Sequence, residues 1–208
     1  SWNRWIERTR LMAAKTAFLD HFQQEDCGQF AIGCSDGASM LVMTHEVYAD
    51  LHPTRNTLPA DAVNCFNKTS RRGVGKGMLT ATEKSGKIRG LVPYFLVSHR
   101  TAIPLYMRNR RKPLLHSKTG MVQGNPFGCA GHGLNQHHML GRCKMICKSR
   151  NLTARFGAFV DDVTIQGPDP SLSFVKDFLA QKGEEEWGYK LNQNPGKTCL
   201  LYTSDAAD

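Results

Sequence analysis

Residues 157–167, GAFVDDVTIQG, place two adjacent carboxylates between two apolar segments of high β propensity. Residues 153–159 and 163–166 alternate apolar with small or polar residues, which predicts a β-hairpin with Asp161 and Asp162 at its tip. Two neighbouring like charges are unfavourable unless they stay in water or a cation neutralises them. The tip is therefore either a polar turn, which Asp favours, or a metal site carried on a hairpin.

The remaining pattern predicts several helices and one further strand, and hence an α/β or α+β domain. A short strand is expected to run into Asp61, whereas residues 91–107 suit either a helix or a strand. Helices are expected at 10–23, from Asp36 as N-cap to Pro53, at 64–71, from Pro126 or Phe127 to about 150, and after Asp169 or Ser171 as N-cap.

Charge and size narrow the class of partner. The 208 residues suffice for one compact domain or one and a half. The net charge of +9 favours polyanionic partners, nucleic acid first. No apolar run approaches the roughly 18 residues that span a bilayer, so no membrane is expected. Seven cysteines at irregular spacing predict reduced, intracellular thiols rather than a disulfide framework.

Four short stretches carry the strongest functional pattern. They are DAVNCFN from Asp61, GMVQGNP from Gly120, FVDD from Phe159, and the segment from Gly188 to Lys197. In this order they resemble the palm motifs of reverse transcriptases, and most of all those of the non-LTR retrotransposon type. The upstream stretch QFAIGCSDGASMLV is similar to a subset of eukaryotic retroelement polymerases, and the resemblance covers roughly residues 27–198.

The resemblance implies an α+β fold, the palm of a right-hand polymerase with part of its fingers. A small antiparallel sheet with helices on its flanks would carry the catalytic hairpin. Residues 1–198 would form this fingers and palm fragment, and the thumb would be absent. The implied activity is RNA-directed DNA polymerisation, in which a nucleotidyltransferase extends a DNA primer on an RNA template with deoxynucleoside triphosphates (dNTP).

The implied chemistry explains the carboxylates. Nucleotide addition is an in-line phosphoryl transfer that two Mg²⁺ ions about 3.5–4 Å apart can assist. Magnesium prefers hard oxygen ligands, so carboxylates from separate segments must converge. The resemblance implies catalytic roles for Asp61 and Asp161, with Asp162 in support or as a ligand of one metal. The implied metal site, for Mg²⁺ or Mn²⁺, comprises Asp61, Ala62, Asp161 and Asp162.

Substrate binding is implied at three positions. Phe66 would pack under the sugar and exclude a 2′-hydroxyl, although an isolated aromatic residue is more often a core residue. Gln123 and Gly124 would support the incoming nucleotide and the template base. Asn125 stands where the family usually has Asp, and it keeps the capping ability before Pro126 but loses the charge.

Basic residues supply further candidates. Lys197 matches a late lysine of the family and is implied as the general acid for pyrophosphate. Lys190 is a rival, because the segment LNQNPGK is two residues longer than the commoner form. A basic stretch interleaved with glycine is either a solvated loop or a phosphate-contacting surface; it contains Arg71, Arg72, Lys76, Lys84, Lys87 and Arg89.

A zinc site is a separate hypothesis. Zinc takes cysteine and histidine at spacings like those of Cys129, His132, His137, His138, Cys143 and Cys147. The order matches no common zinc ribbon or knuckle. Buried cysteines and ordinary histidines explain the same residues.

Two alternatives to an active reverse transcriptase stay open. One alternative is a catalytically inactive nucleic-acid-binding relic, which the absent thumb and Asn125 favour. The other is an RNA-directed RNA polymerase, against which Phe66 and the FVDD form argue.

Residues 199–208, CLLYTSDAAD, match the translation of a sequencing-library adapter, so we expect them to lie outside the domain.

Overall fold

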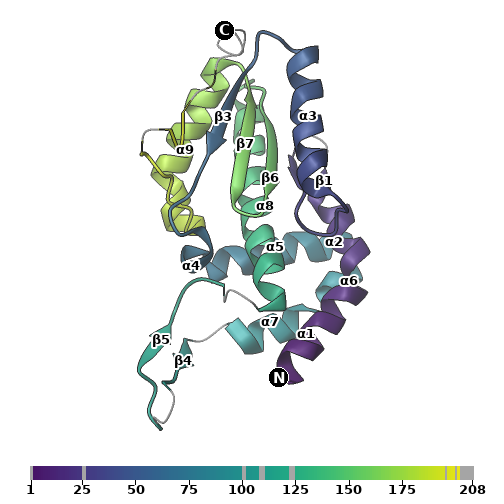
Figure 1. The fold of residues 1–208 in the computed structure, drawn as a ribbon, viewed down its shortest axis with the longest axis vertical. Helices are drawn as coiled ribbons and strands as arrows, with labels where there is room; N and C mark the ends of the chain where they lie inside the picture. Colours follow the sequence, from purple (N-terminus) through teal and green to yellow (C-terminus); the bar gives the residue numbers. More distant parts are fainter. Residues whose placement is uncertain are drawn as a thin grey trace.

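A five-stranded sheet with strand order β1-β2-β6-β7-β3 forms the centre of the fold (Figure 1). The computed structural model describes residues 2–24, 27–99, 102–107, 111–121, 125–194, 196–199 and 201. The strands are β1 (Gln23–Gln24), β2 (Cys27–Gln29), β3 (Asn56–Ala60), β6 (Arg155–Phe159) and β7 (Asp162–Gly167).

The expected α+β class is confirmed, but the sheet is mixed rather than antiparallel. Strands β2 and β6 run parallel, while the other three neighbouring pairs are antiparallel. Parallel neighbours need a long crossover connection. The chain between β2 and β6, from α3 to α8, supplies it.

Helices surround this sheet, and several predicted helices are divided. The helices are α1 (Trp2–Ala13), α2 (Lys15–Phe22), α3 (Gly37–Leu51), α4 (Cys65–Lys68), α5 (Arg71–Lys84), α6 (Gly86–Arg89), α7 (Val92–His99), α8 (Pro126–Ser149) and α9 (Asp169–Trp187). The helix expected at 10–23 breaks at Ala14. The helix expected at 64–71 ends at Lys68, and Ser70 then caps α5 by accepting a hydrogen bond from Gly73 N.

The two faces of the sheet carry different helices. Phe156 and Ala158 of β6 pack in one hydrophobic core with residues of α8 and α9. Gly157, between them, faces the other way, since successive strand residues alternate in direction. A Cβ at Gly157 would lie 2.7 Å from Leu41 Cδ1, so α3 covers this opposite face closely (Figure 1).

Helix α8 joins this core to a second one. Its residues Leu140 and Cys143 belong to the sheet core, whereas Phe127 and Leu134 pack against α2, α5 and α7. The part of α8 from Phe127 to Leu140 is buried almost throughout, so packing against both cores stabilises the helix despite its glycines. Gly77 of α5 allows the close crossing, because a Cβ there would lie 2.3 Å from Leu134 O.

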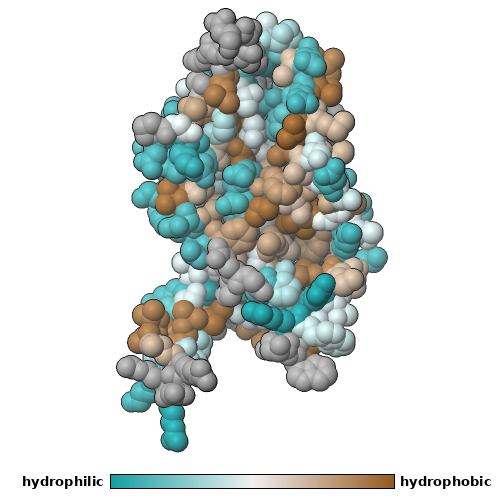
Figure 2. Space-filling model, viewed as in Figure 1, coloured by the Kyte–Doolittle hydropathy of each residue, from teal (hydrophilic) through white to brown (hydrophobic). Residues whose placement is uncertain are grey.

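A two-stranded hairpin projects from the body of the molecule (Figure 1). It pairs β4 (Ile103–Leu105) with β5 (Leu115–Ser117), so the expected element at 91–107 is a helix, α7, followed by a strand. Figure 2 shows apolar side chains on this hairpin, where Leu105, Tyr106 and Leu115 are exposed.

All seven cysteines are free thiols. None of the described helices has the length and apolar character needed to cross a bilayer.

Candidate active site

The tip of the central hairpin is a two-residue turn at Val160 and Asp161. The last pair of β6 and β7 is Phe159 with Asp162, so Asp162 is the first residue of β7 rather than a turn residue. Val160 has a φ of 56°, a left-handed conformation that β-branched residues rarely adopt. Such a backbone persists only where its surroundings hold it in place.

The side chain of Gln29 holds this turn. Gln29 Oε1 accepts hydrogen bonds from Val160 N at 3.2 Å and from Ala31 N at 3.0 Å. Gln29 Nε2 donates to Val160 O at 3.1 Å and to Gln136 Oε1 at 2.6 Å. Both glutamines are buried, so each lost contact would leave a polar group without water. The sequence predicted no role for either residue, although Gln29 opens the QFAIG stretch.

Asp61 and Asp162 lie opposite each other at the ends of neighbouring strands. The register of β3 with β7 ends at Ala60 and Val163, and one further step sets Asp61 against Asp162. Ala60 and Val163 are buried, so their neighbours Asp61 and Asp162 face away from the core. A cavity of about 310 Å³ is lined by both aspartates and by Lys197. The structure thus pairs Asp61 with Asp162, and Asp161 lies in the adjoining turn.

Asp61 is held by the segment that follows α9. Asn192 N donates to Asp61 O at 2.8 Å, and Asn192 Nδ2 donates to Asp61 Oδ2 at 2.9 Å. Lys197 Nζ lies 3.9 Å from the same Oδ2. Asp61 is 32% exposed and Lys197 60%, so solvent screens this ion pair. Ala62 is buried and pairs with Leu191 in an isolated antiparallel β-bridge. Because its side chain is a methyl group, it could offer a cation only its backbone oxygen.

Negative charge accumulates around these residues. Partial burial, and then the charges of Asp161 and Asp61, raise the pKa of Asp162, while Lys197 opposes this. Burial, together with the three aspartates, raises the pKa of Cys65 to about 12. Like charges on opposing strand positions are destabilising on their own, so a cation would relieve them.

The oxygen donors at the strand ends suit Mg²⁺ or Mn²⁺. Within the described residues, however, no three Asp, Glu, His or Cys side chains are grouped as ligands of one ion. The carboxylates of Asp61, Asp161 and Asp162 therefore lie close enough to influence one another without forming a closed ligand set.

Phe66 follows Cys65 in α4 and is only partly buried. Its ring stacks on His132 with centroids 4.6 Å apart, and Phe66 O accepts a hydrogen bond from Met121 N at 2.9 Å. The predicted substrate-binding residues Gln123 and Gly124 lie outside the described residues.

Asn125 caps α8 and contacts a buried acid. Its Oδ1 accepts a hydrogen bond from Phe127 N at 2.8 Å, and its Nδ2 donates to Glu7 Oε1 at 3.2 Å. Glu7 is 3% exposed and also accepts a hydrogen bond from Tyr94. Asn can donate a hydrogen bond to Glu7, whereas a charged Asp at position 125 would repel it.

Two basic candidates are engaged elsewhere. Lys190 lies 3.8 Å from Glu184, so it is Lys197 that lies beside Asp61. Arg71 donates hydrogen bonds to Ser117 O, Ser117 Oγ, Thr119 O and Gly120 O. Arg71 therefore anchors the projecting hairpin instead of standing free for a phosphate.

The residues of the zinc hypothesis do not come together in the described part of the chain. His132 is paired with Thr69 Oγ1 at 2.9 Å, and burial lowers its pKa to about 4. Cys129 is exposed, while Cys143 is buried in the sheet core with a raised pKa caused by that burial.

No protein-family model and no curated protein matches this sequence. Solved structures do match. Apo telomerase from Candida tropicalis aligns with a TM-score of 0.62 at 11% identity, over 99% of this chain and 37% of that chain. Telomerase from Candida albicans in complex with the TWJ fragment of telomeric RNA aligns with a TM-score of 0.53 at 14% identity, over 94% and 34%.

The chain thus spans little more than a third of the length of these telomerases. At such low identity the similarity shows the fold alone. The fold of this chain is thus similar to that of part of each of these telomerases.

Proposed function

We propose that this chain is the fingers and palm part of a retroelement reverse transcriptase of the non-LTR type. The enzyme would extend a DNA primer on an RNA template by nucleotidyl transfer. One observation carries the proposal. In a reverse-transcriptase-like fold, Asp61 and Asp162 lie opposite each other at adjacent strand ends, with Asp161 in the turn beside them.

Asp61, Asp161 and Asp162, with the backbone oxygen of Ala62, are the residues that would hold Mg²⁺ or Mn²⁺. When bound, such ions activate the primer 3′ oxygen and stabilise the leaving pyrophosphate. Asn192 orients the Asp61 carboxylate through its hydrogen bond to Oδ2. The buried Gln29 and Gln136 fix the turn that presents Asp161.

Two further residues have proposed roles around these carboxylates. The partly exposed ring of Phe66 is proposed to exclude a ribose 2′-hydroxyl, and its stacking on His132 keeps the ring in one orientation. Lys197 is proposed to give a proton from Nζ to the leaving pyrophosphate. In this structure Nζ is directed to Asp61 instead, so substrate must compete for it.

Nucleic-acid binding without catalysis is the alternative function. Asn125, which stands where the resembling family usually has Asp, favours this alternative. Both functions predict a template–primer affinity that falls steeply with salt, because Lys and Arg contacts to phosphate release counterions.

Primer extension separates these functions. A protein containing residues 1–198 is incubated with a labelled DNA primer on an RNA template, Mg²⁺ and either deoxy- or ribonucleotides. We expect extension with deoxynucleotides only. Salt-sensitive binding without extension would contradict the polymerase activity of the protein tested, and extension with ribonucleotides would contradict the role of Phe66.

A further inference from the structure

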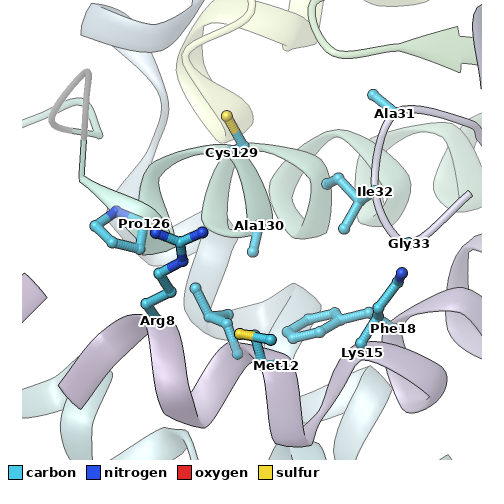
Figure 3. A pocket seen from close by; sticks show the side chains of 11 residues that line it. Arg8, Met12, Lys15, Phe18, Ala31, Ile32, Gly33, Pro126, Cys129 and Ala130 are labelled. Carbon is cyan, nitrogen blue, oxygen red and sulfur yellow. The ribbon is translucent and has the colours of Figure 1, made fainter. Parts of the chain in front are cut away.

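A second cavity, of about 310 Å³, lies between α1, α2, the segment after β2 and the start of α8 (Figure 3). It is separate from the cavity at Asp61, because the two share no lining residue. Its inner wall includes Phe18 and Ala130, which are 2% and 5% exposed, and Ile32, which packs against the second core. Such a wall favours an apolar group on the ligand.

Cations stand at both ends of this apolar wall. Figure 3 shows Arg8 next to Pro126 at one end and Lys15 near Gly33 at the other. Arg8 lies in α1 and Lys15 is the first residue of α2, so each helix supplies one cation. Both side chains are exposed, and neither forms an ion pair with any described residue. The neighbouring Glu7 is engaged by Asn125 and Tyr94.

We propose that this cavity binds one base of a single-stranded nucleic acid, with the flanking phosphates on Arg8 and Lys15. A fatty acid or detergent carries its charge at one end only, whereas a strand carries a phosphate on each side of every base. The volume lies at the lower end of the range for ligand pockets, about 300–1,000 Å³, so it suits one base. The choice of nucleic acid over another anion rests on the proposed function.

The first test compares two ligands that differ only in their bases. Octathymidylate and an abasic strand of the same length carry equal phosphate charge, and octauridylate tests RNA. Binding is measured in EDTA, so that catalysis plays no part. We expect the abasic strand to bind about tenfold more weakly, because it cannot fill the apolar wall. Equal binding of the two strands would overturn the proposal.

Variants of the cavity provide the second test. The double variant Arg8→Gln, Lys15→Gln removes both cations. The slope of log affinity against log salt concentration should become less steep by about 1.4, since each contact to a single-strand phosphate contributes about 0.7. The matched control removes Lys176 and Lys182, two exposed lysines of α9. Ala31→Phe fills the cavity from a loop and keeps the Ala31 N–H, so it should abolish the preference for thymidylate over the abasic strand. An equal loss of slope in the control pair would contradict the proposal.

Alkylation of Cys129 tests whether the strand binds at this cavity. Its thiol is exposed on the rim of the cavity, so N-ethylmaleimide can reach it. Octathymidylate should slow the alkylation of Cys129 several-fold relative to the rate in the protein without a strand, while the abasic strand should not. An unprotected Cys129 would refute the site even if primer extension succeeds. Failure of every strand to bind would contradict the proposed function as well.

Discussion

Val160 and Gln29 exchange two hydrogen bonds across 131 positions of the sequence, from Val160 N to Gln29 Oε1 at 3.2 Å and from Gln29 Nε2 to Val160 O at 3.1 Å. These bonds hold Val160 at a φ of 56° and thereby place Asp161 in the turn. The short strand β2 thus contributes to the site through a side chain that bonds to Val160, the residue next to Asp161.

Gln29→Leu should destabilise the fold and reduce extension. Leucine has a similar volume but removes the hydrogen-bond partner of Val160 N, Val160 O, Ala31 N and Gln136 Oε1, at a cost of about 2–4 kcal/mol. Denaturant unfolding measures this change in free energy. The control Gln181→Leu alters an exposed residue of α9 and should cost less than about 0.5 kcal/mol. Equal stability of the two variants would show that the turn is held by other contacts.

Asn125→Asp should destabilise the protein although it restores the residue usual in the family motif. The new carboxylate would face the buried Glu7, and we expect a loss of about 2 kcal/mol. Adding Glu7→Gln should recover at least half of this loss, since the amide can donate to the new acid. Thermal unfolding of both single variants and the double variant measures the coupling. Additive effects would mean that Glu7 does not determine the residue at 125.

Stability should fall as the pH is lowered from about 6.5 to 4. Burial lowers the pKa of His99 and of His132 to about 4. The unfolded chain, with histidine near 6.5, therefore binds more protons in this window and is favoured. Each histidine contributes a slope of about 1.4 kcal/mol per pH unit inside the window. His99→Leu should remove one such contribution, and an unchanged slope would show that His99 titrates normally in the folded state.

Arg71→Ala should release the base of the projecting hairpin. The guanidinium donates to three residues at 117–120, and a lysine cannot reproduce that fork. Hydrogen exchange of residues 114–120 should therefore rise in Arg71→Ala and in Arg71→Lys. Arg72→Ala, an exposed neighbour on the same helix, should leave exchange unchanged. Protection equal to wild type in both Arg71 variants would refute this anchoring role.

Sequence patterns predicted the elements that are local. The β6–β7 hairpin, the strand before Asp61 and the helix from Pro126 all follow from contiguous signals. The turn lies one residue earlier than expected, because the strand register and not residue preference places Asp162 in β7. The parallel pairing of β2 escaped prediction, since three residues carry no periodic signal.

The contacts among the predicted site residues did not follow from the sequence. The pairing of Asp61 with Asp162, and the position of Lys197 rather than Lys190 beside Asp61, depend on strand register and on the path after α9. Neither is encoded in a local pattern. The same holds for Gln29 and Gln136, whose mutual contact spans 107 positions.

The proposed catalytic role of Asp61 is tested by comparing primer extension by the variants Asp61→Asn and Asp177→Asn in a protein containing residues 1–198. Asp177 is an exposed residue of α9, so its replacement removes the same charge far from the site. We expect Asp61→Asn to slow addition of the first deoxynucleotide by about 100-fold or more, since the proposed role of this carboxylate is to hold a metal ion. Asp177→Asn should extend at the wild-type rate. Extension by Asp61→Asn at the control rate would contradict the assignment of this site.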